Sequence, residues 1–520
     1  MKKKGEIVII YINISHLNMK KLLPTDTLDE LINLQADKFP DDVFLIFNGR
    51  SFTYSNINSK ISIAAEALKR ITDVSGKFIA LICGNTPEFV VAYFAILRAG
   101  GKVVPINPRL GTEEVKHILQ DTCSRFVIHP KNMDVKIPGE KIPLMNNDGI
   151  CIEITVSEIP FGNPDFKTDI SDTAVCIYTS GTTGKPKGAL LSHEAIMHNA
   201  RMCVDGLESR EKVECFVGVL PLFHAFSASA CLMHTIYTGG RLLIIEQFRP
   251  LDVLKQMSEC NATVFLGVPA MYAVMAKVET PPELPYLRQC VSGAAPLPKT
   301  VFDAFYKKFN IKICEGDGPT ECGPATSINP LSGKVKVGTI GVPLCDVEMK
   351  IVDDNEIELP NNEIGEIIVK SPSNFSGYLN KPDETAEPLK SGWVFTGDLG
   401  FKDEDGYFTI VDRKKDMLLV GGLNVYPGEI EEYLREHPGI EDVAVVAKDC
   451  GLRGEIPVAF IVTLNGENLS FADIKEFLKN KIANYKIPKE IIITDALPRN
   501  ATGKVQKKLL REQINQPTAE

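Results

Sequence analysis

The chain has 520 residues and a formal net charge of −10, with 57 Lys and Arg against 67 Asp and Glu. This length favours two or three domains, and the acidic balance gives no support to a nucleic-acid partner. Hydrophobic residues at 44% and charged residues at 24% are typical of a soluble globular protein. The thirteen cysteines have no CxxC or other metal-ligand spacing, which predicts reduced thiols in a cytoplasmic protein and no structural zinc.

The first 26 residues are predicted to be an extension that precedes the fold. Residues 1–12 combine three lysines with an apolar run and weakly resemble a secretion signal, but Glu6 interrupts the run and no cleavage site follows. Met19 is an alternative start. No run of 18 apolar residues occurs, so residues 89–97 are expected to form a buried helix rather than a membrane span.

The pattern along the chain predicts an α/β protein. Thr27 and Glu30 form a capping-box pattern for the first helix. Apolar, strand-like runs then alternate with helix-period segments, which favours parallel sheets covered by helices. The strand-like runs are 78–83, 103–106, 126–129, 174–178, 216–220, 242–245 and 264–268, and two of the helical segments are 113–119 and 251–257.

The later part of the chain has a different pattern. Residues 338–407 show short strands with Gly, Pro and Asn-rich turns, as expected of a small barrel. A charged break follows, and about a hundred residues of mixed helix and strand come after it. We therefore expect a large N-terminal domain of two helix-covered, mostly parallel sheets plus a small barrel, and a small α+β C-terminal domain. The predicted boundaries are 1–26 for the extension, 27–411 for the large domain, 412–415 for a hinge and 416–520 for the small domain.

The segment YTSGTTGKPKG, residues 178–188, is the most informative stretch. It follows an apolar strand and combines three glycines, two lysines and four Ser/Thr hydroxyls. Glycines let backbone N–H groups approach an anion closely, and hydroxyls and lysines add donors and charge. The spacing differs from that of the GxxxxGK[ST] phosphate loop. The segment therefore indicates a phosphate-binding loop of another kind, with a flexible surface loop as the alternative.

Four further motifs follow in order: EGDGPTE (315–321), GWVFTGD (392–398), DRKKD with the GGLN turn (412–424), and PRNATGK (498–504). Together with the glycine-rich loop they resemble the adenylate-forming (ANL) superfamily of acyl-CoA synthetases, adenylation domains and luciferases. The resemblance extends from about residue 28 to residue 511, and it is strongest to bacterial fatty acyl-CoA synthetases. It implies that a carboxylic acid is activated with ATP to an acyl-adenylate, which then passes to CoA.

The resemblance also implies roles for individual residues. Lys504 would bridge the acyl carboxylate and the nucleotide, Thr320 would contact the α-phosphate, and Glu321 would hold Mg²⁺, which favours carboxylate and phosphate oxygens. Asp398 and Arg413 would bind the ribose. The other residues implied in ATP binding are Thr179, Ser180, Gly181, Thr182, Thr183, Gly184, Lys185, Ala295, Glu315, Gly316, Asp317 and Gly318.

The second half-reaction requires a different geometry. In the family the small domain rotates about a residue two positions after the arginine of the charged break, which makes Lys415 the hinge residue here. The turn Gly421, Gly422 and Leu423 would then line the CoA tunnel, and the alternative is a tight glycine turn without a ligand.

The acid is predicted from what the segment PLFHAFSA (221–228) lacks. It has no aspartate where amino-acid-activating relatives hold an α-ammonium, which disfavours an amino-acid substrate. An apolar acyl slot is expected instead, with a packed core histidine as the alternative for His224. The predicted lining is His224, Phe226, Val268, Met271, Ser292, Gly293 and Ala294.

The sequence thus predicts an AMP-forming acyl-CoA ligase (EC 6.2.1.-, with 6.2.1.3 the first choice) that uses ATP, Mg²⁺ and CoA on a medium- or long-chain fatty acid. Alternatives are an aromatic or alicyclic acid, transfer to a carrier protein, and a non-catalytic nucleotide-binding protein. Peripheral membrane contact and a homodimer are left open. The chain departs from the family pattern at Asp317, which replaces the aromatic ring that stacks on adenine, and at Leu419, where some relatives have a lysine.

Overall fold

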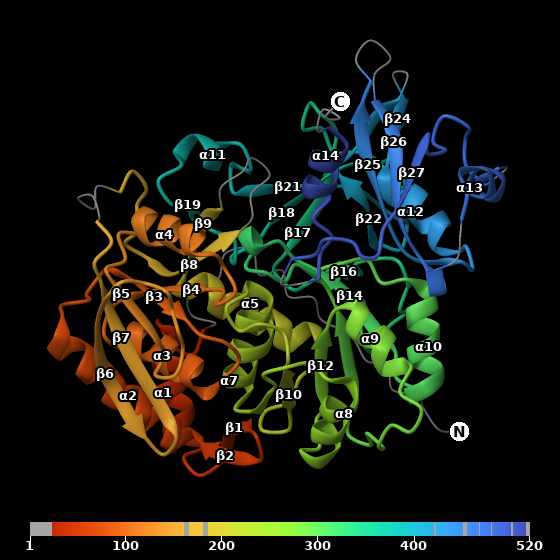
Figure 1. Ribbon diagram of the computed structural model, residues 1–520. Helices are drawn as coiled ribbons and strands as arrows, with labels where there is room; N and C mark the ends of the chain where they lie inside the picture. Colours follow the sequence, from red (N-terminus) through yellow and green to blue (C-terminus); the bar gives the residue numbers. More distant parts are fainter. Residues whose placement is uncertain are drawn as a thin grey trace, which may run out of the picture.

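The computed structural model describes residues 23–160, 166–179, 186–420, 423–450, 455–466, 469–479, 481–500 and 503–515. It confirms the predicted α/β class: two large sheets with helices around them, a smaller antiparallel sheet, and a C-terminal lobe with its own sheet (Figure 1). Most of the predicted extension, residues 1–22, lies outside the described residues.

The first large sheet has nine strands in the order β16-β15-β14-β13-β12-β10-β11-β1-β2, and the pairs from β14 to β1 are parallel. Its parallel part confirms the prediction. The strands are β1 (Val43–Phe47), β2 (Arg50–Thr53), β10 (Cys215–Gly218), β11 (Arg241–Ile244), β12 (Val264–Gly267), β13 (Gln289–Ser292), β14 (Ile313–Asp317), β15 (Ser327–Ile328) and β16 (Val342–Pro343).

The second large sheet has eight strands in the order β19-β9-β8-β4-β3-β5-β7-β6. Only the pairs from β8 to β5 are parallel, so this sheet is mixed rather than mostly parallel. The strands are β3 (Phe78–Ile82), β4 (Lys102–Ile106), β5 (Phe126–Pro130), β6 (Gly139–Asn147), β7 (Ile150–Ser157), β8 (Thr173–Thr179), β9 (Lys187–Ser192) and β19 (Gly377–Tyr378).

Local sequence accounts for the helices that cover these sheets. Helix α1 (Leu28–Lys38) begins with the predicted capping box, in which the Thr27 side chain accepts from the Glu30 amide. Helix α3 (Pro87–Arg98) buries ten of its twelve residues, nine of them in the main hydrophobic core, as the apolar run 89–97 predicts. The other helices of this part are α2 (Tyr54–Ile71), α4 (Thr112–Asp121), α5 (His193–Gly206), α6 (Ala225–Ser227), α7 (His234–Thr238), α8 (Pro250–Glu259), α9 (Pro269–Ala276), α10 (Lys299–Phe309) and α11 (Pro382–Ala386), with a π-helix at Ala228–Met233.

The predicted small barrel is instead a five-stranded antiparallel sheet, and no strand pairing among its described residues closes it into a ring. Strand β21 changes partner along its length: its first residues pair with β20, and the residues from Asp398 on pair with β22. Register shifts in β18–β21 and β21–β22 give the curvature that the turn-rich sequence suggested. The strands are β17 (Glu348–Val352), β18 (Gly365–Lys370), β20 (Leu389–Lys390), β21 (Trp393–Lys402) and β22 (Phe408–Arg413).

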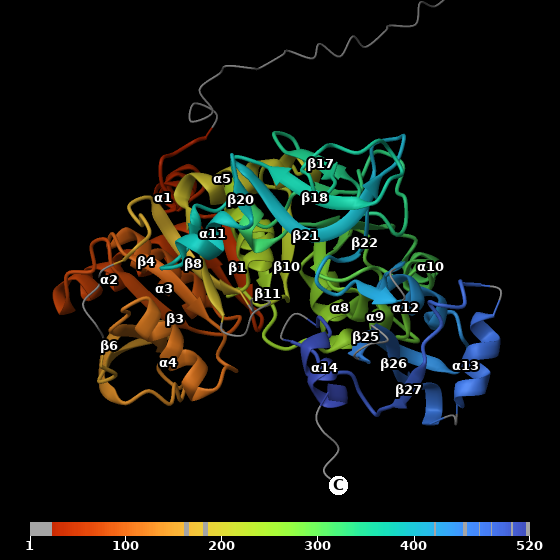
Figure 2. The same cartoon turned by 90° about the horizontal axis from the view of Figure 1, so that it is seen from above.

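The C-terminal lobe packs around cores of its own, which contain residues only from Leu418 onward. Figures 1 and 2 both show it as a separate blue body beside α9, α10 and β22. Its elements are β23 (Leu418–Val420), β24 (Leu423–Val425), α12 (Pro427–Arg435), β25 (Ile440–Asp449), β26 (Glu455–Thr463), α13 (Phe471–Leu478), β27 (Glu490–Ile493) and α14 (Lys507–Asn515).

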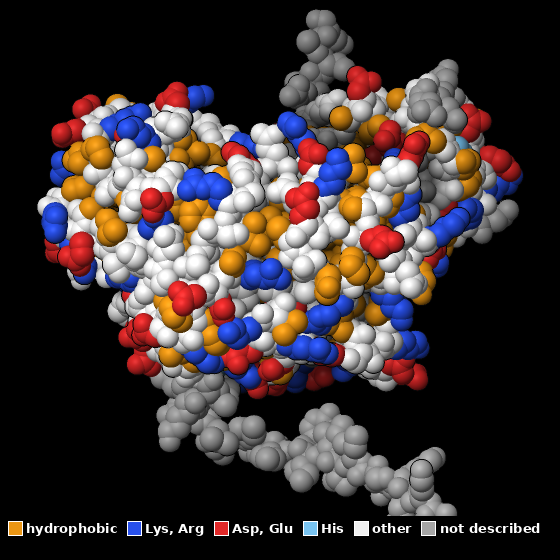
Figure 3. Space-filling view, turned by 90° about the horizontal axis from the view of Figure 1, so that it is seen from below, with side chains coloured by type: hydrophobic (Ala, Val, Ile, Leu, Met, Phe, Trp, Pro, Cys, Tyr) orange, Lys and Arg blue, Asp and Glu red, His pale blue; other side chains and the backbone are white. Residues whose placement is uncertain are grey.

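The surface and the thiols fit the compositional expectation. On the face drawn in Figure 3, acidic, basic and apolar side chains are interspersed. All thirteen cysteines are free thiols, and eight of them are buried. Within the described ranges, no helix combines the length and the apolarity that crossing a bilayer requires.

Candidate active site

The described ends of the glycine-rich segment belong to two paired strands. Strand β8 ends at Thr179, and β9 begins at Lys187 antiparallel to it, with Thr179 opposite Lys187. The predicted phosphate contacts Ser180, Gly181, Thr182, Thr183, Gly184 and Lys185 lie outside the described residues. Gly188 belongs to β9, and a Cβ there would lie 2.6 Å from the Cys176 sulfur, so this glycine permits close strand packing rather than anion contact.

Lys187 does not add a free charge to the loop, contrary to the expectation for both lysines of the segment. Its ammonium pairs with Glu384 at 2.6 Å and lies 5.2 Å from the centre of the Tyr378 ring. The Tyr378 hydroxyl in turn donates to Glu321 Oε1 at 2.7 Å. Tyr378 therefore orients the carboxylate that is predicted to hold the metal, a contact that the sequence analysis missed because the two residues are 57 positions apart.

The EGDGPTE motif passes from the end of β14 into a 3₁₀ turn, Thr320–Cys322. Gly316 and Asp317 pair with β15, which fixes the backbone at this point. A Cβ on Gly318 would overlap the Pro324 carbonyl oxygen, so only glycine fits there. The motif thereby places Asp317, Thr320 and Glu321 along one short bend.

Glu315 and the segment SGAAP (292–296) form the wall beside this bend. Ser292 and Glu315 are neighbours across β13 and β14, and Glu315 Oε1 accepts a hydrogen bond from the Leu297 amide at 3.0 Å. Burial raises the pKa of Glu315 to about 8, Asp317 adds to this, and the Leu297 and Gly338 amides oppose it. Glu315 therefore holds its proton at neutral pH and anchors the end of the segment. Ala295 is half-buried within it.

Asp398 and Arg413 face each other across β21 and β22. The Arg413 Nε lies 2.6 Å from Asp398 Oδ1, and Asp398 is only 4% exposed. Burial raises the pKa of Asp398 to about 6, while Arg413 opposes the rise. A carboxylate with acceptors only, held in place by one cation, suits a diol ligand.

Lys504 reaches this group from the C-terminal lobe. It lies on the loop before α14, where its amide donates to Asn500 Oδ1 at 2.9 Å. The Lys504 side chain remains exposed to solvent. Desolvation by the surrounding protein, and then the charge of Arg413, lower the pKa of Lys504. The carboxylates of Asp317, Asp398 and Glu321 oppose this lowering. The structure thus brings together five of the predicted site residues from four separate segments.

The predicted second-step residues follow Arg413 in the chain. Lys415 is in the turn between β22 and β23, and desolvation, with Arg413, lowers its pKa. Leu423 begins β24 and is 50% exposed, and Gly421 and Gly422 lie outside the described residues.

A small apolar cavity lies next to Lys504. Its volume is about 10 Å³, the space of about one water molecule, and its lining is Leu220, Pro221, His224, Phe226, Val268 and Ala294. Burial, and then the Lys504 charge, lower the pKa of His224 to about 4, so this imidazole is neutral. The Gly503 backbone lies close to Val268: a Cβ added to Gly503 would be 4.0 Å from Val268 Cγ2.

Four of the seven predicted acyl residues line this cavity. Gly293 lies just behind it, where an added Cβ would be 3.3 Å from the Phe226 ring. Met271 packs into the second hydrophobic core, and Ser292 is fully buried in β13. Leu220 was missed, although its place after strand β10 is the signal that could have found it.

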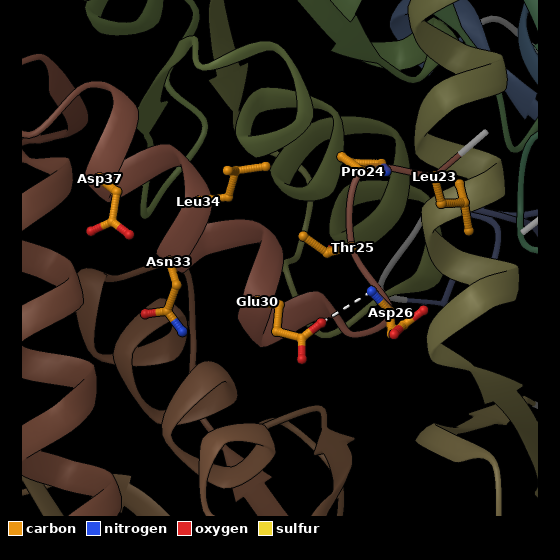
Figure 4. Close-up of a pocket in the computed structure, with 8 residues that line it drawn as sticks. All are labelled: Leu23, Pro24, Thr25, Asp26, Glu30, Asn33, Leu34 and Asp37. Carbon is orange, nitrogen blue, oxygen red and sulfur yellow. Dashed lines mark hydrogen bonds between the residues drawn. The ribbon is translucent and has the colours of Figure 1, made fainter. Parts of the chain in front are cut away.

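A second hollow lies away from these residues, on helix α1. Figure 4 shows its lining of Leu23, Pro24, Thr25, Asp26, Glu30, Asn33, Leu34 and Asp37, with the Asp26 amide donating to Glu30 at 3.0 Å. None of the predicted site residues takes part. Its lining includes Leu23, the first described residue, and we attach no function to it.

The residues present fit a nucleotide and a divalent cation. Glu321 has one oxygen held by Tyr378, and no hydrogen bond from a described residue occupies the other. Mg²⁺ commonly binds one or two carboxylates together with substrate phosphates. Gly293, Gly316 and Gly318 each pack closely against neighbouring atoms. Because none of them has a side chain, the backbone beside Asp317 forms a cradle without side chains. No cluster of three or more metal-binding side chains occurs in the described parts of the chain.

Comparison with known proteins agrees with this geometry. Residues 32–379 match the family described as AMP-binding enzyme, and residues 429–504 match the AMP-binding enzyme C-terminal domain. The chain is 33% identical to a long-chain-fatty-acid–CoA ligase of Bacillus subtilis, covering 94% of this chain and 95% of that protein. It is 31% identical to a feruloyl-CoA synthase of an Amycolatopsis species, covering 90% and 94%.

Solved structures show the same fold. ATP-bound MatB of Rhodopseudomonas palustris superposes with a TM-score of 0.83 at 28% identity, covering 94% of this chain and 99% of that one. The apo form of the same protein gives 0.72. From the family match, the identity over nearly the whole chain and the order of the five motifs, the chain belongs to the AMP-binding enzyme family, within the adenylate-forming superfamily, as an AMP-forming acyl-CoA ligase.

Proposed function

We propose that the protein activates a medium- or long-chain fatty acid with ATP and transfers the acyl group to CoA, in the cytoplasm. The observation that carries this is the neighbourhood of Lys504: on one side lie Asp398 and Arg413, and on the other an apolar cavity that no acidic side chain lines. Such a lining suits an aliphatic chain and offers nothing to hold an α-ammonium. The identity to a long-chain-fatty-acid–CoA ligase supports the same acid class.

In the first half-reaction the acid's carboxylate attacks the α-phosphorus of ATP, and pyrophosphate leaves. Lys504 would hold a positive charge where negative charge gathers, an effect commonly worth about 3 kcal/mol or more. Asp317, Asp398 and Glu321 favour its protonated form, which this role requires. Asp398 and Arg413 would hold the ribose, and Thr320 would contact the α-phosphate. Mg²⁺ at Glu321 would neutralise the leaving pyrophosphate.

In the second half-reaction the CoA thiol attacks the acyl carbonyl and AMP leaves. With Lys504 close to His224 and the Gly503 backbone close to Val268, the approach to the carbonyl from the lobe side is occupied in this structure. The lobe must therefore move before the thiol can enter, and we assign the hinge to Lys415, in the turn between β22 and β23. The separate core of the lobe supports movement as one body.

The cavity itself is too small for an acyl chain in this arrangement. Phe226 forms one side of it and is only partly buried, so a change of its rotamer is the simplest way to admit a chain. We expect the bound acid to extend past Phe226 and Val268.

A panel of acids tests the proposal. AMP and pyrophosphate release are measured with and without CoA for saturated acids of graded length and for ferulic, coumaric and benzoic acids. We expect the highest kcat/KM for a medium- or long-chain acid, with AMP release dependent on CoA at steady state. A higher kcat/KM for an aromatic acid would contradict the proposed acid class.

A further inference from the structure

Helix α12 of the C-terminal lobe begins without a cap of its own. The first four N–H groups of a helix have no partner within it. The residue before α12, Tyr426, makes no side-chain cap hydrogen bond, and Pro427 occupies the first turn. The Gly428 amide donates instead to Asp412 Oδ2 at 2.6 Å. The cap of this helix therefore comes from a residue 16 positions earlier.

Asp412 is fixed to the large domain. It lies in β22 opposite Leu399 of β21, is 8% exposed, and accepts from the Arg413 amide through its other oxygen at 2.7 Å. The helix end comes very close, because a Cβ on Gly428 would lie 2.6 Å from the Val411 carbonyl oxygen and 3.3 Å from Asp412 Oδ2. The contact thus requires glycine at position 428.

Charges on the lobe surround the same carboxylate. Lys507, the first residue of α14, pairs with Glu431 of α12 at 2.8 Å, and its charge also acts on Asp412. The positive end of the helix dipole points the same way. Helix α14 follows directly on the loop that carries Lys504. The contacts of α12 and Lys507 with Asp412 therefore also set the position of Lys504.

We propose that Asp412 is a positioning residue for adenylate formation, a cap supplied across the hinge that holds the lobe in the arrangement that presents Lys504. The inference rests on the proposed function and on the hinge at Lys415, which lies between Asp412 and Gly428 in the chain. Rotation there separates the carboxylate from the helix end, since β21 holds Asp412 in place. The higher TM-score to ATP-bound than to apo MatB agrees with an arrangement suited to ATP.

The test compares Asp412→Ala with a matched control. Glu429→Ala removes a carboxylate from the first turn of the same helix, but its partner Lys486, at 2.6 Å, belongs to the same lobe. Loss of a cap of this kind corresponds to about a threefold to thirtyfold change. We expect Asp412→Ala to lower the rate of acyl-adenylate formation by that factor while thioester formation from supplied acyl-adenylate stays at or above the wild-type rate. Glu429→Ala should leave the ratio of the two rates unchanged.

A second measurement does not depend on activity. Hydrogen exchange of residues 427–435 in the ligand-free enzyme should be faster in Asp412→Ala than in the wild type. If the alanine variant does not fold, Asp412→Asn keeps an acceptor without the charge, and it should give a smaller change of the same sign. An equal fall of both half-reactions, or an unchanged ratio with unchanged exchange, would overturn the proposal. A wild-type enzyme that adenylates no acid would refute the proposed function instead, and the exchange result would still decide the role of Asp412.

Discussion

Replacing Glu315 by glutamine tests the conclusion that a buried carboxyl beside the nucleotide motif is neutral. The pKa of about 8 lies far above the ordinary value of 4.5, a difference that corresponds to up to about 5 kcal/mol. Because the folded state binds this proton more tightly than the unfolded state, its stabilising contribution is complete below pH 4.5 and is lost as the pH rises through 8. Glutamine cannot ionise and still offers an oxygen to the Leu297 amide, so it removes this dependence.

The assay is denaturant unfolding at pH 5.5, 6.5, 7.5 and 8.5. Between pH 5.5 and pH 8 we expect the unfolding free energy of the wild type to fall by about 3 kcal/mol more than that of Glu315→Gln. Glu214→Gln is the control, because Glu214 is equally buried but pairs with Arg288, so its replacement should destabilise at every pH. Parallel pH profiles for the wild type and Glu315→Gln would refute the reasoning.

Four further substitutions address the chemistry. Lys504→Ala should abolish adenylate formation and spare thioester formation from supplied acyl-adenylate, and an equal loss of both would make Lys504 structural. Lys415→Pro should do the reverse, because proline fixes φ near −65°; normal overall turnover in steady-state assays would argue against the hinge. Gly293→Leu should shorten the preferred acid, because the new side chain would meet the Phe226 ring; an unchanged chain-length profile would place position 293 outside the acyl site. Asp317→Ala should raise the KM for ATP roughly tenfold and weaken discrimination against GTP if the carboxylate accepts from the adenine amino group, and unchanged constants would leave it only a charge partner of Lys504.

Local sequence patterns predicted well those elements whose structure depends only on their own residues. The Thr27 capping box and the fully buried strand at 78–82 need only their own residues, and both occur as predicted. The predicted strand 264–268 stops at Gly267 because Val268 becomes the residue before helix α9. The barrel was wrong in detail, because closure depends on pairing between distant strands, which turn residues do not encode.

In the candidate site, too, the sequence predicted what depends on local motifs and missed what depends on distant contacts. The sequence motifs pointed to Lys504, Asp398 and Glu321, since the order and type of residues are visible in a sequence. The structure brings these three residues together, and their roles stay predictions. Sequence could not show that Lys187 is already paired with Glu384, because that partner lies 197 positions later and its distance depends on the whole sheet. The unusual pKa of Glu315 depends on burial, which a lone Glu in a motif does not reveal.

The two ends of the proposed site are built from different parts of the chain. The apolar cavity takes its walls from the segments after β10, β12 and β13, whereas the group around Asp398 comes from the bend after β14, from β21 and β22, and from the C-terminal lobe. Among the described residues, the short SGAAP segment adjoins both ends: Ala294 lines the cavity, and the Leu297 amide directly after the segment donates to Glu315. Ala294 has a φ of 69°, a left-handed conformation that tolerates few side chains. Evolution can therefore exchange one carboxylic acid for another by changing Leu220, Phe226 or Val268 without disturbing the nucleotide, while residues 293 and 294 are expected to resist such drift.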